Sequence, residues 1–160
     1  MAHIVQGMGV EETGTRGIIF VRRMYDSDDC VCFVYEGVYS DYNSHPTWLG
    51  WKIYEAMRGR GIDGVEDFKR EILSGRFSDG TEIRGLEPKH IDHALHKWIY
   101  VIEDTGFEVW KSSHRERRLY YCGWVSIFDE PEEARLRLLI AEMLGDAMEK
   151  ITMRELPARL

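Results

Sequence analysis

The sequence contains few cysteines and no long apolar run, and both shortages narrow the class of protein. Three cysteines in 160 residues are a small and odd number for a disulfide framework, so we expect buried, reduced thiols in a reducing compartment. No apolar stretch approaches the roughly 20 residues that a bilayer span needs. Residues 1–7 lack the basic and apolar regions of a signal peptide. We therefore predict a cytoplasmic protein with no membrane partner.

Basic residues are outnumbered by acidic ones. The 21 Lys and Arg against 28 Asp and Glu give a formal net charge of −7. Direct binding to duplex nucleic acid needs a basic face that neutralises phosphates, and the one short basic block, over residues 115–118, is interrupted by a glutamate. We expect no direct duplex nucleic-acid binding, and we interpret the acidic balance as the net charge of a small soluble domain.

No motif for a metal, a nucleotide or an activated nucleophile is complete. The sequence lacks a Cys-x-x-Cys pair, a His-x-x-x-His pattern with its glutamate, a Gly-x-Ser-x-Gly elbow and a Walker loop. Three histidines, His90, His93 and His96, recur every three residues, so the third drifts about 120° off a shared helix face. We interpret them as the exposed polar face of a short helix. We predict no metal and no cofactor, and leave open whether the protein is an enzyme.

The patterns that are present predict elements in the order ββ-ααα-βββ-α. β-branched and apolar residues predict two strands over 18–24 and 30–38, joined by an acidic turn. Three further strands are predicted over 99–103, 107–111 and 119–128. Two hairpins and few crossovers favour an α+β fold with a mainly antiparallel sheet of about five strands and helices packed on one face.

Helix signals lie between and after the strands. Pro46 suits the first position of a helix, and the segments 63–66 and 129–132 each carry an aspartate followed by glutamate at capping-box spacing. Pro88 opens a short third helix, after a predicted loop over residues 76–86. The last helix has the widest apolar stripe, which we expect to cover the sheet. Its members are Leu136, Leu139, Ile140, Met143, Leu144, Ala147 and Ile151.

The sequence shows no repeat, no low-complexity tract and no linker. We therefore predict a single α+β domain over residues 14–156, which follows an N-terminal extension over residues 1–13. A chain of this length is enough for one domain with its own core.

The loop before Pro46 is the candidate ligand site, because polar residues gather there where a helix begins. Free amides at a helix start, with nearby hydroxyls and an imidazole, form an anion-binding corner. In an antiparallel hairpin the start of the first strand lies beside the end of the second, so we expect Arg16 to lie near Asp41. The alternative is structural, in which these residues cap the helix and fasten the loop. The predicted ligand-binding residues are Arg16, Asp41, Ser44, His45 and Thr47.

The same block carries a family resemblance. Gly14-Thr15-Arg16-Gly17 precedes a strand, and Asp41-Tyr42, Pro46-Thr47 and Leu49-Gly50 follow the hairpin. These residues resemble an uncharacterised family of small phage and bacterial proteins that begin Gly-Thr-Arg-Gly and later carry an Asp-x-Tyr-Pro-x-x-Leu-Gly-like motif. The chain departs from the pattern by thirteen residues before the motif and by residues 43–45, which lengthen the loop. The resemblance implies a phage-associated protein in the host cytoplasm and supplies no mechanism.

Three functions follow as hypotheses. We favour a soluble binding protein, an accessory or counter-defence factor that binds a host or viral protein stoichiometrically. The alternative is a small enzyme, or a protein that sequesters a phosphorylated or nucleotide-like anion. There Arg16 would bind the anion, His45 would act as acid or base, and Asp41 would orient His45. The third hypothesis is a structural component of a virion, which would self-assemble.

Overall fold

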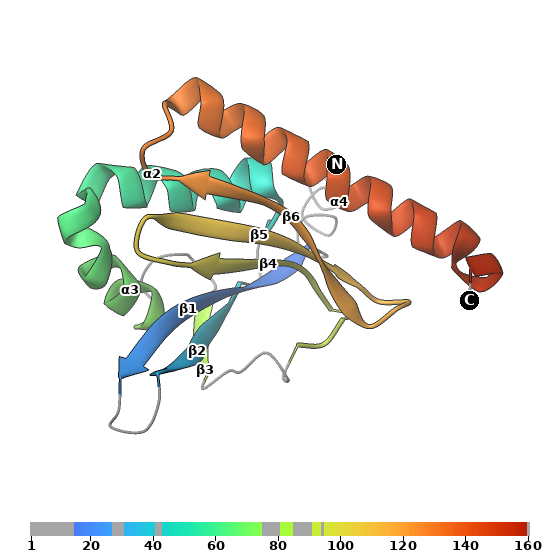
Figure 1. Cartoon of the computed structure of the whole chain (residues 1–160), viewed down its shortest axis with the longest axis horizontal. Helices are drawn as coiled ribbons and strands as arrows, with labels where there is room; N and C mark the ends of the chain where they lie inside the picture. Colours follow the sequence, from blue (N-terminus) through green and yellow to red (C-terminus); the bar gives the residue numbers. More distant parts are fainter. Residues whose placement is uncertain are drawn as a thin grey trace, which may run out of the picture.

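A computed structural model describes residues 15–26, 31–40, 43–74, 81–84, 91–93 and 95–159. Within these residues six strands form one mixed sheet, in the order β3-β2-β1-β4-β5-β6 (Figure 1). Neighbouring strands are antiparallel except β1 and β4, which are parallel. The strands are β1 (Arg16–Asp26), β2 (Val31–Ser40), β3 (Thr81–Arg84), β4 (His96–Ile102), β5 (Gly106–Ser113) and β6 (Arg118–Ser126).

The two central strands, β1 and β4, are apolar on both faces. Residues 18–21 of β1 and 98–102 of β4 are at most 7% exposed. A continuous apolar run is expected where both faces of a strand are covered. The middle of this sheet therefore contacts apolar side chains on both sides, and the two sides differ in what covers them.

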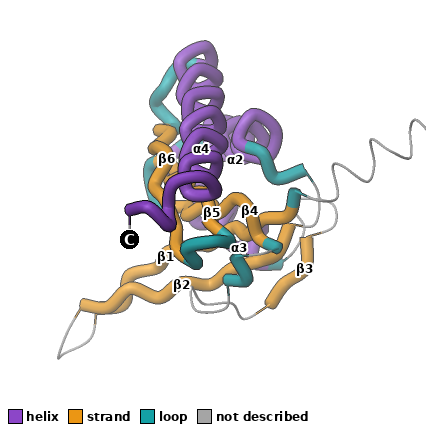
Figure 2. Tube along the Cα trace, turned by 90° about the vertical axis from the view of Figure 1, so that its right-hand side faces the viewer, coloured by secondary structure: helices purple, strands orange, loops and turns teal. Residues whose placement is uncertain are grey.

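The helices cover one face of the sheet. Side chains such as Ile53, Phe68 and Leu138 pack with Ile19 and Tyr100 in the larger apolar core. Figure 2 shows α4 and α2 side by side on one side of the sheet. None of the described helices is long and apolar enough to cross a membrane. The helical elements are the π-helical turn η1 (Pro46–Gly50), α2 (Trp51–Arg60), the 3₁₀ turn η2 (Ile62–Gly64), α3 (Val65–Leu73) and α4 (Pro131–Arg159).

The predicted α+β class, the mainly antiparallel sheet of about five strands and the one-sided packing of helices are confirmed, and one further short strand is found. The segment 76–86, predicted as a loop, contains β3, which pairs with the end of β2 through Val38 and Ile83. A strand of four residues at a sheet edge carries too little alternation to be recognised. The predicted extension over residues 1–13 lies outside the described residues.

The predicted third helix is corrected over the part of its span that is described. Residues 91–93 and 95 are irregular or form a turn, and His96 begins β4 by pairing with Arg16. The imidazole of His96 is buried and stacks on Tyr39, with 5.0 Å between ring centroids. His93 Nδ1 lies 2.6 Å from Ser112 Oγ. These two histidines face the sheet rather than solvent, because tertiary contacts override the local helical pattern.

Candidate functional site

The polar loop before η1 closes tightly onto β1 and β4. The buried Ser44 donates its N–H to the Thr15 carbonyl (3.0 Å), and Tyr100 Oη donates to the Ser44 carbonyl (2.5 Å). Gly17 permits this approach. A Cβ at Gly17 would lie 2.5 Å from the Trp98 carbonyl oxygen and 2.9 Å from the Ser44 Cβ. The second glycine of the Gly-Thr-Arg-Gly motif is therefore required by packing.

Glu142 of α4 accepts hydrogen bonds at the start of η1. Both the backbone N–H and the hydroxyl of Thr47 donate to Glu142 Oε1, at 3.1 and 2.8 Å. His45 Nδ1 lies 4.0 Å from the same oxygen, and His45 Nε2 lies 3.3 Å from Thr15 Oγ1. A helix start favours a negative charge. Here the chain itself supplies that charge.

The structure brings together three of the five predicted ligand-binding residues. Ser44 and His45 directly precede η1, and Thr47 is its second residue, although the Ser44 side chain is buried. Arg16 is exposed at the start of β1, and its neighbour Gly17 pairs with the last residue of β2, so the two strand ends are adjacent as expected. Asp41 lies outside the described residues. A ligand role for these residues, and the Arg16–Asp41 pair, stay predictions.

We expect Glu142→Ala to lower the free energy of unfolding by about 1 kcal/mol, because removing a side-chain acceptor at a helix start typically costs that much. Thr47→Ala removes the hydroxyl that donates to the same oxygen. The double variant should therefore cost less than the sum of the single variants. Urea unfolding of the four proteins measures this coupling, and strict additivity would contradict it.

α4 has two apolar faces, and only one of them packs on the sheet. Ala134, Leu138, Ala141 and Gly145 are buried beneath the helix. At 100° per residue these positions share one side. The opposite side carries large aliphatic residues that are between 43% and 61% exposed. This outer row consists of Leu136, Leu139, Ile140, Met143 and Leu144.

This arrangement reverses the prediction for the last helix. Five residues of the stripe that was expected to cover the sheet face outward instead, and small residues face inward. The physical reason is that α4 lies very close to the sheet. The indole of Trp98 lies beneath Gly145, where a Cβ would be 2.8 Å from the indole Cζ3, so a larger side chain has no room. The Ala134, Ala141 and Gly145 series was the sequence signal for a closely packed helix face.

A groove of about 200 Å³ adjoins the outer row. In it the Arg135 guanidinium lies over the Trp51 ring, 3.8 Å from the ring centroid. Tryptophan and arginine are the residue types that most often dominate binding energy at protein interfaces. The groove is lined by Thr47, Trp51, Arg135, Leu138 and Leu139. We call the outer row, together with Trp51 and Arg135, the α4 surface.

The fold and this surface define an α+β protein with an exposed apolar helix face. No protein-family model, no curated protein and no solved structure matched the chain in comparisons. The residues of the α4 surface are therefore the basis for the function proposed next.

Proposed function

We propose that the protein binds another protein through the α4 surface. The observation that carries this proposal is the row of five large aliphatic side chains exposed on the side of α4 opposite the sheet. Soluble monomers rarely expose large contiguous apolar patches, and such patches mark interaction sites. Full burial of one such side chain contributes about 1.5–3 kcal/mol, so covering several of them can support a stable complex.

The occupant that we propose is an amphipathic helix of the partner. Leu136, Ile140, Met143 and Ala147 recur at intervals of four, three and four residues, the spacing of a seam between two helices. α4 has 29 residues and is therefore about 43 Å long, which leaves room for several turns of a second helix.

The positive charge of Arg135 at the groove indicates which residue type the partner helix carries there. Among the described residues Arg135 has no carboxylate within ion-pair distance, and its guanidinium is held in place by the Trp51 ring. An arginine fixed in this way can donate two parallel hydrogen bonds to one carboxylate. We therefore propose a partner helix that carries an acidic residue beside its apolar side.

The partner that we propose is a host or viral protein in the host cytoplasm, because the Gly14–Gly50 block resembles a phage and bacterial family. Stoichiometric binding would make this chain an accessory or counter-defence factor. Glu142 already accepts the hydrogen bonds of Thr47, so the start of η1 is less suited to a free anion than the alternative hypothesis requires. This contact favours protein binding over capture of a phosphorylated ligand at that loop.

The test uses the double variant Ile140→Glu/Met143→Glu, which places two negative charges at the centre of the outer row. Its matched control is Ile62→Glu, which alters an exposed isoleucine on η2. Each tagged protein is used to capture partners from host extract, the captured partner is purified, and its complex is measured by calorimetry. Light scattering gives the oligomeric state of each variant, and circular dichroism verifies its fold.

We expect a partner that binds the wild type and the Ile62→Glu control at 1:1 and binds the double variant at least tenfold more weakly. The proposal is wrong if the double variant binds equally well, or if no partner forms a 1:1 complex. A wild type that is dimeric, with a monomeric double variant, would also overturn it, because a second copy would then be the occupant.

A further inference from the structure

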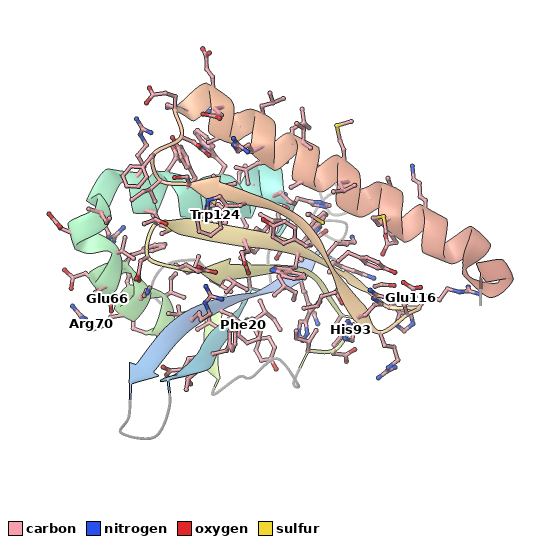
Figure 3. All side chains as sticks on the ribbon, in the orientation of Figure 1. Phe20, Glu66, Arg70, His93, Glu116 and Trp124 are labelled. Atoms are coloured by element: carbon pink, nitrogen blue, oxygen red, sulfur yellow. The ribbon has the colours of Figure 1, made fainter. Side chains whose placement is uncertain are left out.

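The sheet face without a described helix carries a separate cavity. Its floor is formed by Phe20, Ile99 and Val101, which are buried in a small apolar cluster distinct from the main core. Figure 3 labels Phe20 on the side of β1 away from α4. The cavity measures about 140 Å³. Its remaining lining residues are Tyr35, Ile91, Glu108, Trp110 and Leu119.

Aromatic rings form much of the wall. The Tyr35 ring meets the Phe20 ring edge-on, with centroids 6.2 Å apart. Trp110 meets Tyr121 in a similar way at 5.2 Å. These side chains converge because of strand register: Phe20 pairs with Val101 across the parallel strands, and Trp110 pairs with Ile99 across β4 and β5.

Charged groups lie on the same face beside the cavity. Arg22 Nη2 is 2.5 Å from Glu103 Oε1, and Arg22 pairs with Tyr35 in the register of β1 and β2. Glu108 lines the cavity itself and accepts a hydrogen bond from Trp110 Nε1 at 3.1 Å. Two carboxylates against one guanidinium leave this region acidic when both carboxyls are ionised.

The pKa values of neighbouring groups are shifted in the direction that this negative charge favours. Burial raises the pKa of Glu103, and the charge and hydrogen bond of Glu108 raise it further, against the lowering effect of Arg22. Burial raises the pKa of Tyr121, and the negative charges of Glu108 and Glu103 add to this effect. A positive charge brought to the rim would relieve the repulsion between the two carboxylates.

We propose that this cavity binds a small organic cation, an ammonium or guanidinium group carried on an apolar body of about the size of a benzene ring. Aromatic faces attract cations, and Glu108 supplies a carboxylate within the lining. The volume is close to the roughly 150 Å³ of an apolar cavity that binds benzene. A free amine and the lysine or arginine side chain of a peptide share this chemistry. The site lies on the face of the sheet opposite the α4 surface and does not depend on it.

The shifted carboxyl gives a prediction for stability. Because the pKa of Glu103 is raised above its ordinary value of 4.5, the folded protein binds more protons than the unfolded chain just above that pH. The free energy of unfolding therefore falls as the pH rises through this window. Relative to Glu103→Gln, the wild type should lose stability between pH 4.5 and the raised pKa, as measured by urea midpoints from pH 4 to 7. A relative gain would show that attraction by Arg22 prevails.

The binding test is a titration followed by ¹H–¹⁵N NMR at the indole signal of Trp110, assigned with Trp110→Phe. The ligands are benzylammonium, benzyl alcohol and benzoate, which differ in charge at nearly constant size. Blocked lysine and arginine derivatives distinguish a peptide side chain from a free amine. Glu108→Gln keeps an oxygen that accepts the indole N–H but removes the charge, and the exposed Glu55→Gln is the matched control.

We expect a cation to shift the Trp110 signal and to bind at least tenfold more tightly than benzyl alcohol or benzoate. Glu108→Gln should weaken it at least tenfold, while Glu55→Gln and Ile140→Glu/Met143→Glu leave it unchanged. Tightest binding by benzylammonium indicates a free amine, and tightest binding by a blocked amino acid indicates a peptide. The proposal is overturned if no cation shifts the signal, if the neutral compound binds as tightly, or if Glu108→Gln binds undiminished.

Discussion

Gly17→Ala is expected to lower the free energy of unfolding by about 3 kcal/mol, a large effect for a single added methyl group. The added Cβ would lie 2.5 Å from the Trp98 carbonyl oxygen, and 2.9 Å from both the Cβ and the Oγ of Ser44. The nearest atom is backbone, so relief requires the two central strands to separate. Overpacking a close contact costs typically 1–3 kcal/mol, and more where backbone must move.

Thermal and urea unfolding measure this loss, which corresponds to a fall of about 10 °C in Tm for a chain of this size. Arg16→Ala is the matched control, because Arg16 is the adjacent, exposed residue of β1 and should change stability by about 0.5 kcal/mol at most. Equal stability of Gly17→Ala and the wild type would show that the loop does not pack closely against β1 and β4 at Gly17.

Gly145→Ala should destabilise the protein by about 2 kcal/mol, although alanine is the better helix former by about 1 kcal/mol. Gly145 lies directly against the indole of Trp98, and a Cβ there would also lie 3.2 Å from the Lys111 Cβ. Trp98 is fully buried and has no room to move away. α4 must therefore shift outward, and the packing loss exceeds the gain in helix propensity.

Gly59→Ala provides the contrasting control, because it makes the same change within α2 where a Cβ meets nothing within 4 Å. This variant should be more stable than the wild type by about 0.5–1 kcal/mol. Unfolding in urea distinguishes the two signs, and near-UV circular dichroism reports the environment of Trp98. A stabilising Gly145→Ala would mean that α4 does not rest on the tryptophan.

Local patterns sufficed for five of the six strands and for the helices that begin at Pro46, at Val65 and after Asp129. The capping box predicted over residues 63–66 is wrong, because α3 begins after Gly64 and has no side-chain cap. Those elements have either continuous apolar runs or clear start signals. The orientation of α4 could not be predicted in the same way, because larger side chains were assumed to face inward. Closeness to Trp98 selected small residues instead. That choice depends on a residue about 47 positions away in the chain.

The organic-cation cavity was also beyond local reasoning. In the sequence alone, the charged residues beside the cavity do not differ from ordinary polar residues at strand ends or on strand surfaces. These residues are Arg22, Glu103 and Glu108. Only the parallel pairing of β1 with β4 places Arg22 next to Glu103, and only the following hairpin adds Glu108. The unexplained signal in the sequence was that residues 18–21 and 99–102 are apolar at every position. Such runs indicate that apolar side chains pack against both faces of the sheet.

The parallel pairing of β1 and β4 also has a consequence for the order of folding. It joins two antiparallel halves, β3-β2-β1 and β4-β5-β6, whose internal pairings are mostly between neighbours in the chain. The Gly17–Trp98 pairing closes a loop of about 80 residues, an entropic cost that hairpins avoid. We expect the halves to form early and to dock late. If docking is the rate-limiting step, Gly17→Ala should slow refolding as well as speed unfolding. If docking follows that step, the variant should only speed unfolding, and stopped-flow kinetics distinguish the two cases.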